Sequence, residues 1–207
     1  MTRQQYMAML VRDFHSAVAA TIGADGHPQT RVIDMMLEDE QGIYFLTAKG
    51  KAFYEQLTSQ QYIAITAVQG KRAISLQGKV KNIGTDRLDD ILAQNPYMQQ
   101  IYPEGSRTAL TVFCLYEAQG EYFDITAPAH IIRETIVLGD ASVKPSGYVI
   151  GQGCMGCQLC AGVCPQRCID LSQTPAVIDQ NRCLHCGNCA QICPQQAIEK
   201  RYSYESK

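Results

Sequence analysis

The strongest constraint on the fold of this chain is a cysteine run that occurs twice toward its C-terminal end. The first run is Cys154-x2-Cys157-x2-Cys160-x3-Cys164-Pro165, and the second is Cys183-x2-Cys186-x2-Cys189-x3-Cys193-Pro194. Each cysteine of the second run follows its counterpart by 29 positions, so the segment is an internal duplication. Since the stretch that holds both runs is too short to build a large apolar core, bound metal has to supply much of its stability.

This spacing resembles that of bacterial two-cluster ferredoxins. Three cysteines at positions i, i+3 and i+6 can bind three iron corners of a cubane cluster, and the fourth thiolate has to come from elsewhere. In the ferredoxins it comes from the other run. The resemblance implies one [4Fe–4S] cluster on Cys154, Cys157, Cys160 and Cys193, and a second on Cys183, Cys186, Cys189 and Cys164.

Disulfides and zinc are the alternatives for these cysteines. A disulfide framework suits secreted proteins, but the N-terminus does not look like a signal peptide. Zinc sites use C-x2-C pairs, yet they have no need of a third cysteine followed by Cys-Pro. Two further cysteines are expected to pack, since Cys168 stands where the repeat has Ala197, and Cys114 lies in a β-branched and aromatic stretch.

Composition limits the partners and the location. The 207 residues are enough for one ordinary domain and a small one. Only 18% of them are charged and the net charge is −2, so no basic surface for nucleic acid is expected. No stretch approaches the roughly 20 apolar residues that span a bilayer, which predicts a soluble protein. Thiolate-rich motifs without a secretion signal indicate a cytoplasmic location.

The chain divides near residue 143, which predicts one domain over 1–142 and a second over 143–207, joined by a turn-forming linker at 139–147. A capping box of Thr2 and Gln5 predicts a first helix from Thr2 to about Arg12. The remaining expected strands are 16–22, 29–36, 43–47, 62–68, 73–81, 108–116 and 121–125, and the remaining helices are 51–57 and 86–94. The first three strands are expected to form an antiparallel meander, and the whole a small closed barrel.

The order of motifs in this domain resembles the pyridoxamine 5′-phosphate oxidase-like FMN-binding split barrel. The motifs are Asp25-Gly-His-Pro28, Arg31-Val-Ile-Asp34, Gly42-Ile-Tyr-Phe-Leu-Thr47, Lys49-Gly-Lys51, Leu76-Gln-Gly78 and Glu121-Tyr-Phe-Asp124. The resemblance implies a mainly β fold, a split β-barrel, followed by a small α+β dicluster ferredoxin-like domain.

The same resemblance implies an FMN site. Arg31 and Lys51 match the residues that grip the FMN phosphate in the family, and Lys49 adds charge. Val32, Ile33, Asp34, Leu46 and Thr47 would line the flavin, and Gln77 would reach a flavin shared with a second subunit. The four histidines are not clustered in the sequence, and His185, within the second cysteine run, is expected at most to tune a cluster. No catalytic residue is identified.

Two functions follow from these resemblances. The favoured one is a homodimeric oxidoreductase in which two [4Fe–4S] clusters exchange single electrons with FMN, and FMN exchanges them with a small substrate or a redox partner. The alternative is a non-enzymatic electron carrier whose barrel serves dimerisation, docking or haem binding. A true pyridoxamine phosphate oxidase is not expected, since the family's C-terminal segment with arginine and tryptophan is replaced by the cysteine domain and the chain has no tryptophan.

Overall fold

The computed structural model describes residues 1–142 and 146–201, so residues 143–145 of the expected linker lie outside the described part. Contacts divide the chain into two compact units. The first comprises residues 1–122 and 135–142, and the second comprises residues 123–134 together with the described part of 143–207. The second unit thus includes a segment, 123–134, from before the expected boundary at residue 143.

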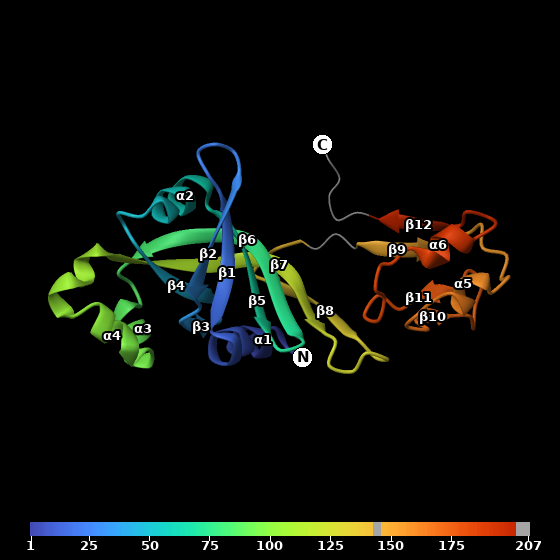
Figure 1. Cartoon of the computed structure of the whole chain (residues 1–207), viewed down its shortest axis with the longest axis horizontal. Coiled ribbons are helices and arrows are strands. Elements are labelled where there is room, and N and C mark those ends of the chain that lie inside the picture. Colours follow the sequence, from blue (N-terminus) through green and yellow to red (C-terminus); the bar gives the residue numbers. More distant parts are fainter. Residues whose placement is uncertain (143–145, 202–207) are drawn as a thin grey trace. The chain divides into compact units, whose positions relative to one another are not determined.

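The first unit is built on one strongly curved sheet of eight strands (Figure 1), although the last residues of β7 and the first of β8 are assigned to the second unit. The strands are β1 (Ser16–Ile22), β2 (Pro28–Asp34), β3 (Leu37–Asp39), β4 (Gly42–Ala48), β5 (Tyr62–Gln69), β6 (Arg72–Gly84), β7 (Leu110–Asp124) and β8 (Ile132–Leu138). Their order is β2-β1-β5-β6-β7-β4-β3, and β8 also pairs with β7.

This strand order corrects two expectations. The meander is wrong, because β4 pairs with β7 and β3 and not with β2. The barrel is split and not closed, since the end strands β2 and β3 are not paired with each other in the part of the chain that the structure describes. The strands expected at 108–116 and 121–125 are one continuous strand, β7, and the pattern missed both β3 and β8.

The helices of the first unit are α1 (Arg3–Met9), α2 (Ala52–Gln60), α3 (Leu88–Gln94) and α4 (Pro96–Ile101), with a π-helical turn over Leu10–Phe14 and a 3-10 helix over Glu104–Ala109. The capping box is confirmed: Thr2 accepts a hydrogen bond from the Gln5 N–H, and the Gln5 side chain accepts one from the Thr2 N–H. In the part that the structure describes, no helix is long and apolar enough to cross a lipid bilayer.

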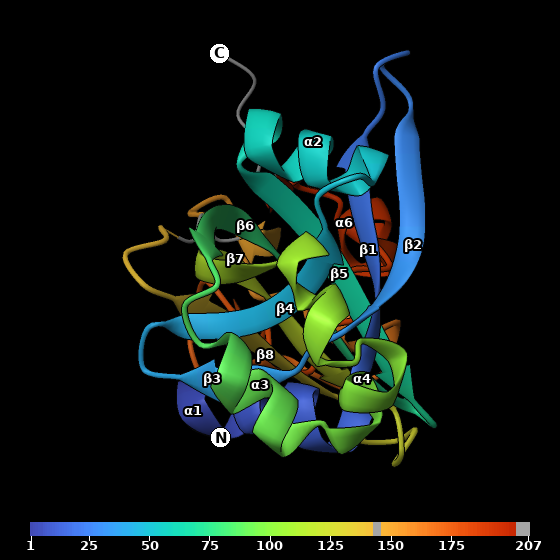
Figure 2. The same ribbon diagram turned by 90° about the vertical axis from the view of Figure 1, so that its left-hand side faces the viewer.

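Two apolar cores lie on opposite faces of β4, because successive side chains of a strand point to opposite sides. Ile43 and Phe45 belong to the core inside the barrel. Tyr44 and Leu46 pack in a second core, with α3 and α4 on the outside (Figure 2). Inside the barrel, Gly78 of β6 allows close approach of β7, since a Cβ at that position would lie 2.1 Å from the Glu117 carbonyl oxygen.

The second unit preserves the duplication in its geometry. Its elements are β9 (Gly147–Ile150), α5 (Leu159–Gly162), β10 (Ile169–Asp170), β11 (Val177–Ile178), α6 (Asn188–Ile192) and β12 (Ile198–Arg201). Strand β9 pairs with β12, and β10 pairs with β11, so each short sheet joins the two halves. Residues with left-handed backbone recur 29 positions apart at 156 and 185, at 158 and 187, and at 167 and 196. The arrangement confirms the expected fold class of a mainly β unit followed by a small α+β unit.

The strands ahead of the two cysteine runs match with a shift of one residue. Ile150 pairs with Ile198, and Ile178 pairs with Ile169. Ile150 is therefore the structural counterpart of Ile178, although it lies one residue closer to the cysteine run that follows it.

Candidate functional site

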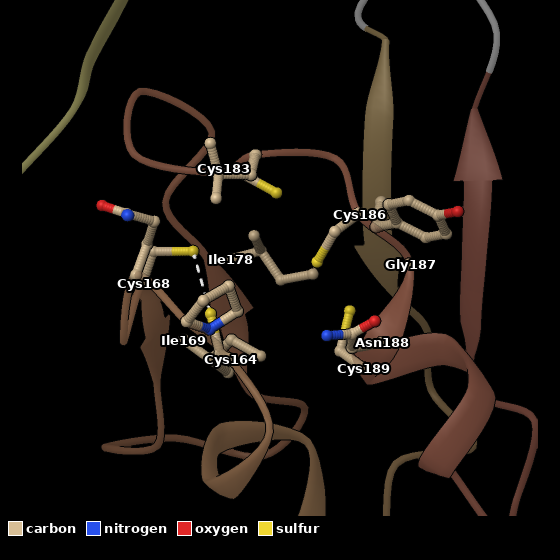
Figure 3. A pocket seen from close by; sticks show the side chains of 13 residues that line it. Cys164, Cys168, Ile169, Ile178, Cys183, Cys186, Gly187, Asn188 and Cys189 are labelled. Atoms are coloured by element: carbon tan, nitrogen blue, oxygen red, sulfur yellow. Dashed lines mark hydrogen bonds between the residues drawn. The ribbon is translucent and has the colours of Figure 1, made fainter. Parts of the chain in front are cut away.

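Two pockets in the described part of the second unit are each lined by four of the cysteines that the ferredoxin resemblance assigns to one cluster. Cys164, Cys183, Cys186 and Cys189 line the first of these, which holds about 330 Å³ of empty space. Their sulfur atoms face a common space in Figure 3. Cys154, Cys157, Cys160 and Cys193 line the second, with about 390 Å³. The structure thus brings the fourth cysteine of each run beside the first three of the other run.

Isoleucines from both halves pack under the thiols and complete each pocket. Ile169 and Ile178 line the pocket of the second run, and Ile150 and Ile198 line the pocket of the first run. Gly187 lies against Tyr148, whose hydroxyl would be 2.6 Å from a Cβ at that position. Its left-handed backbone, at φ +83°, also favours glycine there.

The cysteine thiols are neither joined in disulfides nor gathered around a single point in the described structure. All ten cysteines of the chain are free. Among the residues that the structure describes, no three ligating side chains meet closely enough to hold a single metal ion. The separation of the four cysteine side chains around each pocket fits a cluster, because each thiolate of a cubane binds a different iron atom.

Backbone amides favour the thiolate form at two of these cysteines. Hydrogen bonds from the N–H groups of Ala176 and Gly156 lower the pKa of Cys154. Burial raises the pKa of Cys164, but hydrogen bonds from the backbone and thiol of Cys168 outweigh it and lower the pKa overall. Such donors stabilise negative sulfur, which is the form that binds iron.

Cys168 and Cys114 are both buried, as expected. Cys114 lies in the second core of the barrel, where burial raises the pKa of its thiol to about 11. Cys168, however, does more than fill space, because it lines the pocket of the second run. Its sulfur lies 3.5 Å from that of Cys164, and burial raises the pKa of the Cys168 thiol (Figure 3). The repeat predicted the burial of Cys168 and missed this contact.

Two arginines contact residues of the second unit that lie next to the pocket of the second run, and sequence reasoning missed both. Arg133, at the start of β8, lies 2.9 Å from Nδ1 of His185 and 4.9 Å from the ring centre of Phe123. Arg182 donates to the carbonyl oxygen of Gln166 at 2.9 Å. The duplication could have given a signal, since the positions equivalent to Arg182 and His185 in the first run are both glycines, Gly153 and Gly156.

Arg31 is held on β2 against the first turns of α2. It donates to Oγ1 of Thr21 at 2.6 Å and to Oε1 of Gln56 at 2.9 Å, and it lies 4.4 Å from the ring centre of Phe53. These hydrogen bonds use two of the five N–H donors of a guanidinium. Burial lowers the pKa of Arg31, although the group stays charged at any ordinary pH.

The two candidate lysines lie in different surroundings. Lys51 is exposed at the N-terminal cap of α2, the same helix that holds Arg31 through Gln56. A helix N-terminus with two nearby cations is suited to an anion such as phosphate. Lys49 lies instead beside the start of β7, with Nζ 3.5 Å from the carbonyl oxygen of Thr108.

Leu46 and Thr47 point to opposite faces of β4, so their side chains do not line one pocket together. Leu46 packs in the core under α3 and α4. Thr47 is buried, at 4% exposed, and its Oγ1 has no hydrogen-bond partner in the described structure. Since a buried hydroxyl without a partner is costly, this atom fits a site that a bound polar group completes.

The remaining candidates divide between the two faces of the sheet. Ile33 packs on the barrel core, whereas Val32 is 68% exposed. Pairing places Val32 in a row with Val18 and Thr66 on the outer face, and Gln77 lies on the same face one row away, beside Ala64.

Asp34 belongs to a hydrogen-bonded cluster that the sequence did not indicate. It accepts from the Ser16 hydroxyl at 2.6 Å and from the Tyr97 hydroxyl at 2.8 Å, and His15 Nε2 lies 3.1 Å from the same Tyr97 oxygen. Burial, with the Asp34 contact, raises the pKa of Tyr97. Tyr97 comes from α4, a helix that the pattern did not predict, which is why the cluster was missed.

Comparison with known proteins agrees with both halves of this description. A family model described as pyridoxamine 5′-phosphate oxidase matches residues 4–134, and a model described as 4Fe-4S binding domain matches residues 176–199. The second match contains all four cysteines of the second run.

Individual relatives are distant. A pyridoxine/pyridoxamine 5′-phosphate oxidase of Paracidovorax citrulli is 29% identical over 100 residues, which are 47% of this chain and 44% of that protein. The chain therefore spans less than half the length of this curated relative.

Solved structures share the fold of the barrel. A NimC/NimA family protein from Clostridium acetobutylicum has a TM-score of 0.56 at 17% identity, covering 67% of this chain and 95% of its own. A heme binding protein from Mycobacterium smegmatis has a TM-score of 0.50 at 12% identity, covering 65% and 58%. With the model match over most of the barrel, the chain belongs to the pyridoxamine 5′-phosphate oxidase family and carries a 4Fe-4S binding domain in addition.

Proposed function

We propose that the chain is an iron–sulfur flavoprotein oxidoreductase in which electrons pass singly between two [4Fe–4S] clusters and FMN, which exchanges them with a small substrate. The observation that carries the proposal is the presence, in one chain, of two pockets that each contain four predicted ligand cysteines and of a barrel with cations beside the start of α2. Flavin is the cofactor that joins one-electron carriers to two-electron chemistry.

The ligand sets in this proposal are those of the two pockets. Cys154, Cys157, Cys160 and Cys193 would hold one cluster, and Cys183, Cys186, Cys189 and Cys164 the other. The N–H groups around Cys154 and Cys164 would stabilise negative sulfur. The isoleucines that line the two pockets would exclude water from the iron.

On the barrel, Arg31 and Lys51 would bind the FMN phosphate beside the N-terminus of α2. The hydrogen bonds to Thr21 and Gln56 fix the guanidinium, so little side-chain freedom is lost on binding. The Thr47 hydroxyl would gain the partner that it lacks in the protein alone.

A homodimer is part of the proposal. Three valines on the outer face of β2, β1 and β5 are exposed, with Val32 at 68%, Val18 at 47% and Val68 at 66%. An exposed apolar group of this kind on a sheet favours burial against a second copy of the chain. Gln77, on the same face, would then lie at the interface and could contact the partner's flavin.

Oxidation of vitamin B6 compounds, the activity named for the curated relatives, is not proposed for this chain. The chain spans less than half of the Paracidovorax citrulli protein, and it has no tryptophan. A small substrate or a protein redox partner is proposed in its place.

The test compares Lys51→Ala with Lys71→Ala, which removes the same charge from an exposed position on the turn between β5 and β6. In anaerobically purified protein, Lys51→Ala is expected to lower the flavin content while iron stays unchanged, and Lys71→Ala is expected to change neither. Wild-type protein with full iron and no flavin would overturn the proposal. A haem spectrum, or no cofactor on the barrel, would support the electron-carrier alternative.

A further inference from the structure

The two cysteine pockets have the same ligand pattern but different surroundings, and three of the differences place an added polar or charged side chain at or near the pocket of the second run. Cys168 lines that pocket, and Arg182 and His185 lie within two residues of Cys183 in the sequence, whereas the equivalent positions of the first run are Ala197, Gly153 and Gly156. Repeated units that keep the same left-handed backbone positions can be compared side chain by side chain.

Cys168 provides the first difference. Its sulfur lies 3.5 Å from that of Cys164, a predicted ligand. A protonated thiol beside a ligand sulfur can donate a hydrogen bond to it. At the other pocket, Cys193 has Ala197 in this place, which offers its backbone N–H at 3.4 Å but has no side-chain donor.

The arginines provide the second difference. Arg133 contacts the side chain of His185 at 2.9 Å. The His185 N–H donates to the sulfur of Cys183 at 3.4 Å, a bond that the first run shares through the Gly156 N–H and Cys154. Arg182, directly before Cys183, has its Nε buried without a hydrogen-bond partner in the described structure. Among the described residues no charged side chain lines either pocket, so the two arginines act from behind the lining of the second-run pocket.

We propose that the cluster held by Cys164, Cys183, Cys186 and Cys189 has the higher reduction potential of the two, and that the Cys168 thiol contributes to the difference by donating to Cys164. The inference rests on the two-cluster function proposed above. Reduction adds one negative charge to a cluster, so hydrogen bonds to its sulfurs and nearby cations stabilise the reduced form. One electron shared by the two sites would leave the first cluster oxidised and the second reduced, with no bond made or broken.

The test is a potentiometric titration of the anaerobically purified, full-length protein, followed by electron paramagnetic resonance. The wild type is expected to show two midpoint potentials. Cys168→Ala is expected to lower only the higher one, changing the ratio of reduced to oxidised cluster about tenfold at a fixed potential, which is about 59 mV for a one-electron couple. Cys168→Ser keeps a hydroxyl donor and should preserve the wild-type value.

The matched control is Ala197→Cys, which places a thiol at the equivalent position of the other pocket. It is expected to raise only the lower midpoint potential. Two unshifted potentials in Cys168→Ala, or a shift of the lower one, would overturn the inference. Loss of about half the iron in Cys168→Ala would also overturn it, because Cys168 would then be a ligand and not a donor. A wild type with a single cluster would instead contradict the proposed function.

Discussion

Replacing Thr47 with valine should have opposite effects on the stability of the flavin-free protein and on its affinity for FMN. The Thr47 hydroxyl is buried and has no hydrogen-bond partner in the described structure. Burying such a group costs about 1–3 kcal/mol, and valine has the same shape without the hydroxyl. Thr47→Val should therefore stabilise the flavin-free protein, within about that range.

The FMN-bound protein should respond differently. If the hydroxyl binds FMN, its removal costs the net value of one hydrogen bond, about 0.5–1.5 kcal/mol. That corresponds to an affinity about 2- to 12-fold weaker. Urea unfolding of the flavin-free protein measures the first effect, and quenching of FMN fluorescence measures the second.

Thr111→Val is the matched control, because Thr111 lies directly opposite Thr47 on β7 and is also buried. Its hydroxyl donates to Oδ1 of Asn82 at 2.7 Å. Valine at this position should destabilise the protein by about 0.5–1.5 kcal/mol, since a hydrogen bond that exists is lost. The reasoning is refuted if Thr47→Val destabilises the flavin-free protein as Thr111→Val does, or if FMN affinity does not change.

Two further predictions concern the barrel. Val32→Lys should shift the protein from dimer to monomer in light scattering, because it places a charge on the exposed apolar face; an unchanged mass would exclude that face as the interface. Burial raises the pKa of Asp39, but hydrogen bonds from the Gln41 N–H, the Tyr44 hydroxyl and the Arg87 guanidinium outweigh it and lower the pKa overall. The stability that Asp39 contributes is therefore present above the unfolded value of about 3.9 and is lost as pH falls through the lower folded value. Asp39→Asn should lower stability at pH 7 and flatten its decline in acid, as urea titrations at several pH values would show; an equally steep acid decline would count against this.

The local sequence pattern was sufficient to locate most of the helices and strands of the barrel. The capping box located the first helix, and β-branched alternation located β1 with the bounds that the structure has. Strand pairing was harder, because β4 has no local signal that it pairs with β7, more than 60 residues later, and not with β2. Such long-range pairing depends on which faces are buried together, and a single sequence does not state that.

The same limit applies to the candidate sites. The resemblance to two-cluster ferredoxins predicted which cysteines gather in each pocket, and the internal repeat placed three of each set in one short loop. It did not predict Arg133, because this residue reaches His185 from β8, about 50 residues earlier in the chain. For the flavin residues, the resemblance predicted which positions contribute but not the face of the sheet to which each side chain points. Leu46 and Thr47 point to opposite faces of β4.

The most direct test of the account is to measure iron, acid-labile sulfide and flavin in protein purified without oxygen. Two [4Fe–4S] clusters and a bound flavin predict about eight irons, about eight sulfides and about one FMN per chain. About four irons per chain would mean that one of the two cysteine pockets holds no cluster. Full iron with no flavin would show that the barrel does not bind FMN, and it would contradict the proposal of an iron–sulfur flavoprotein.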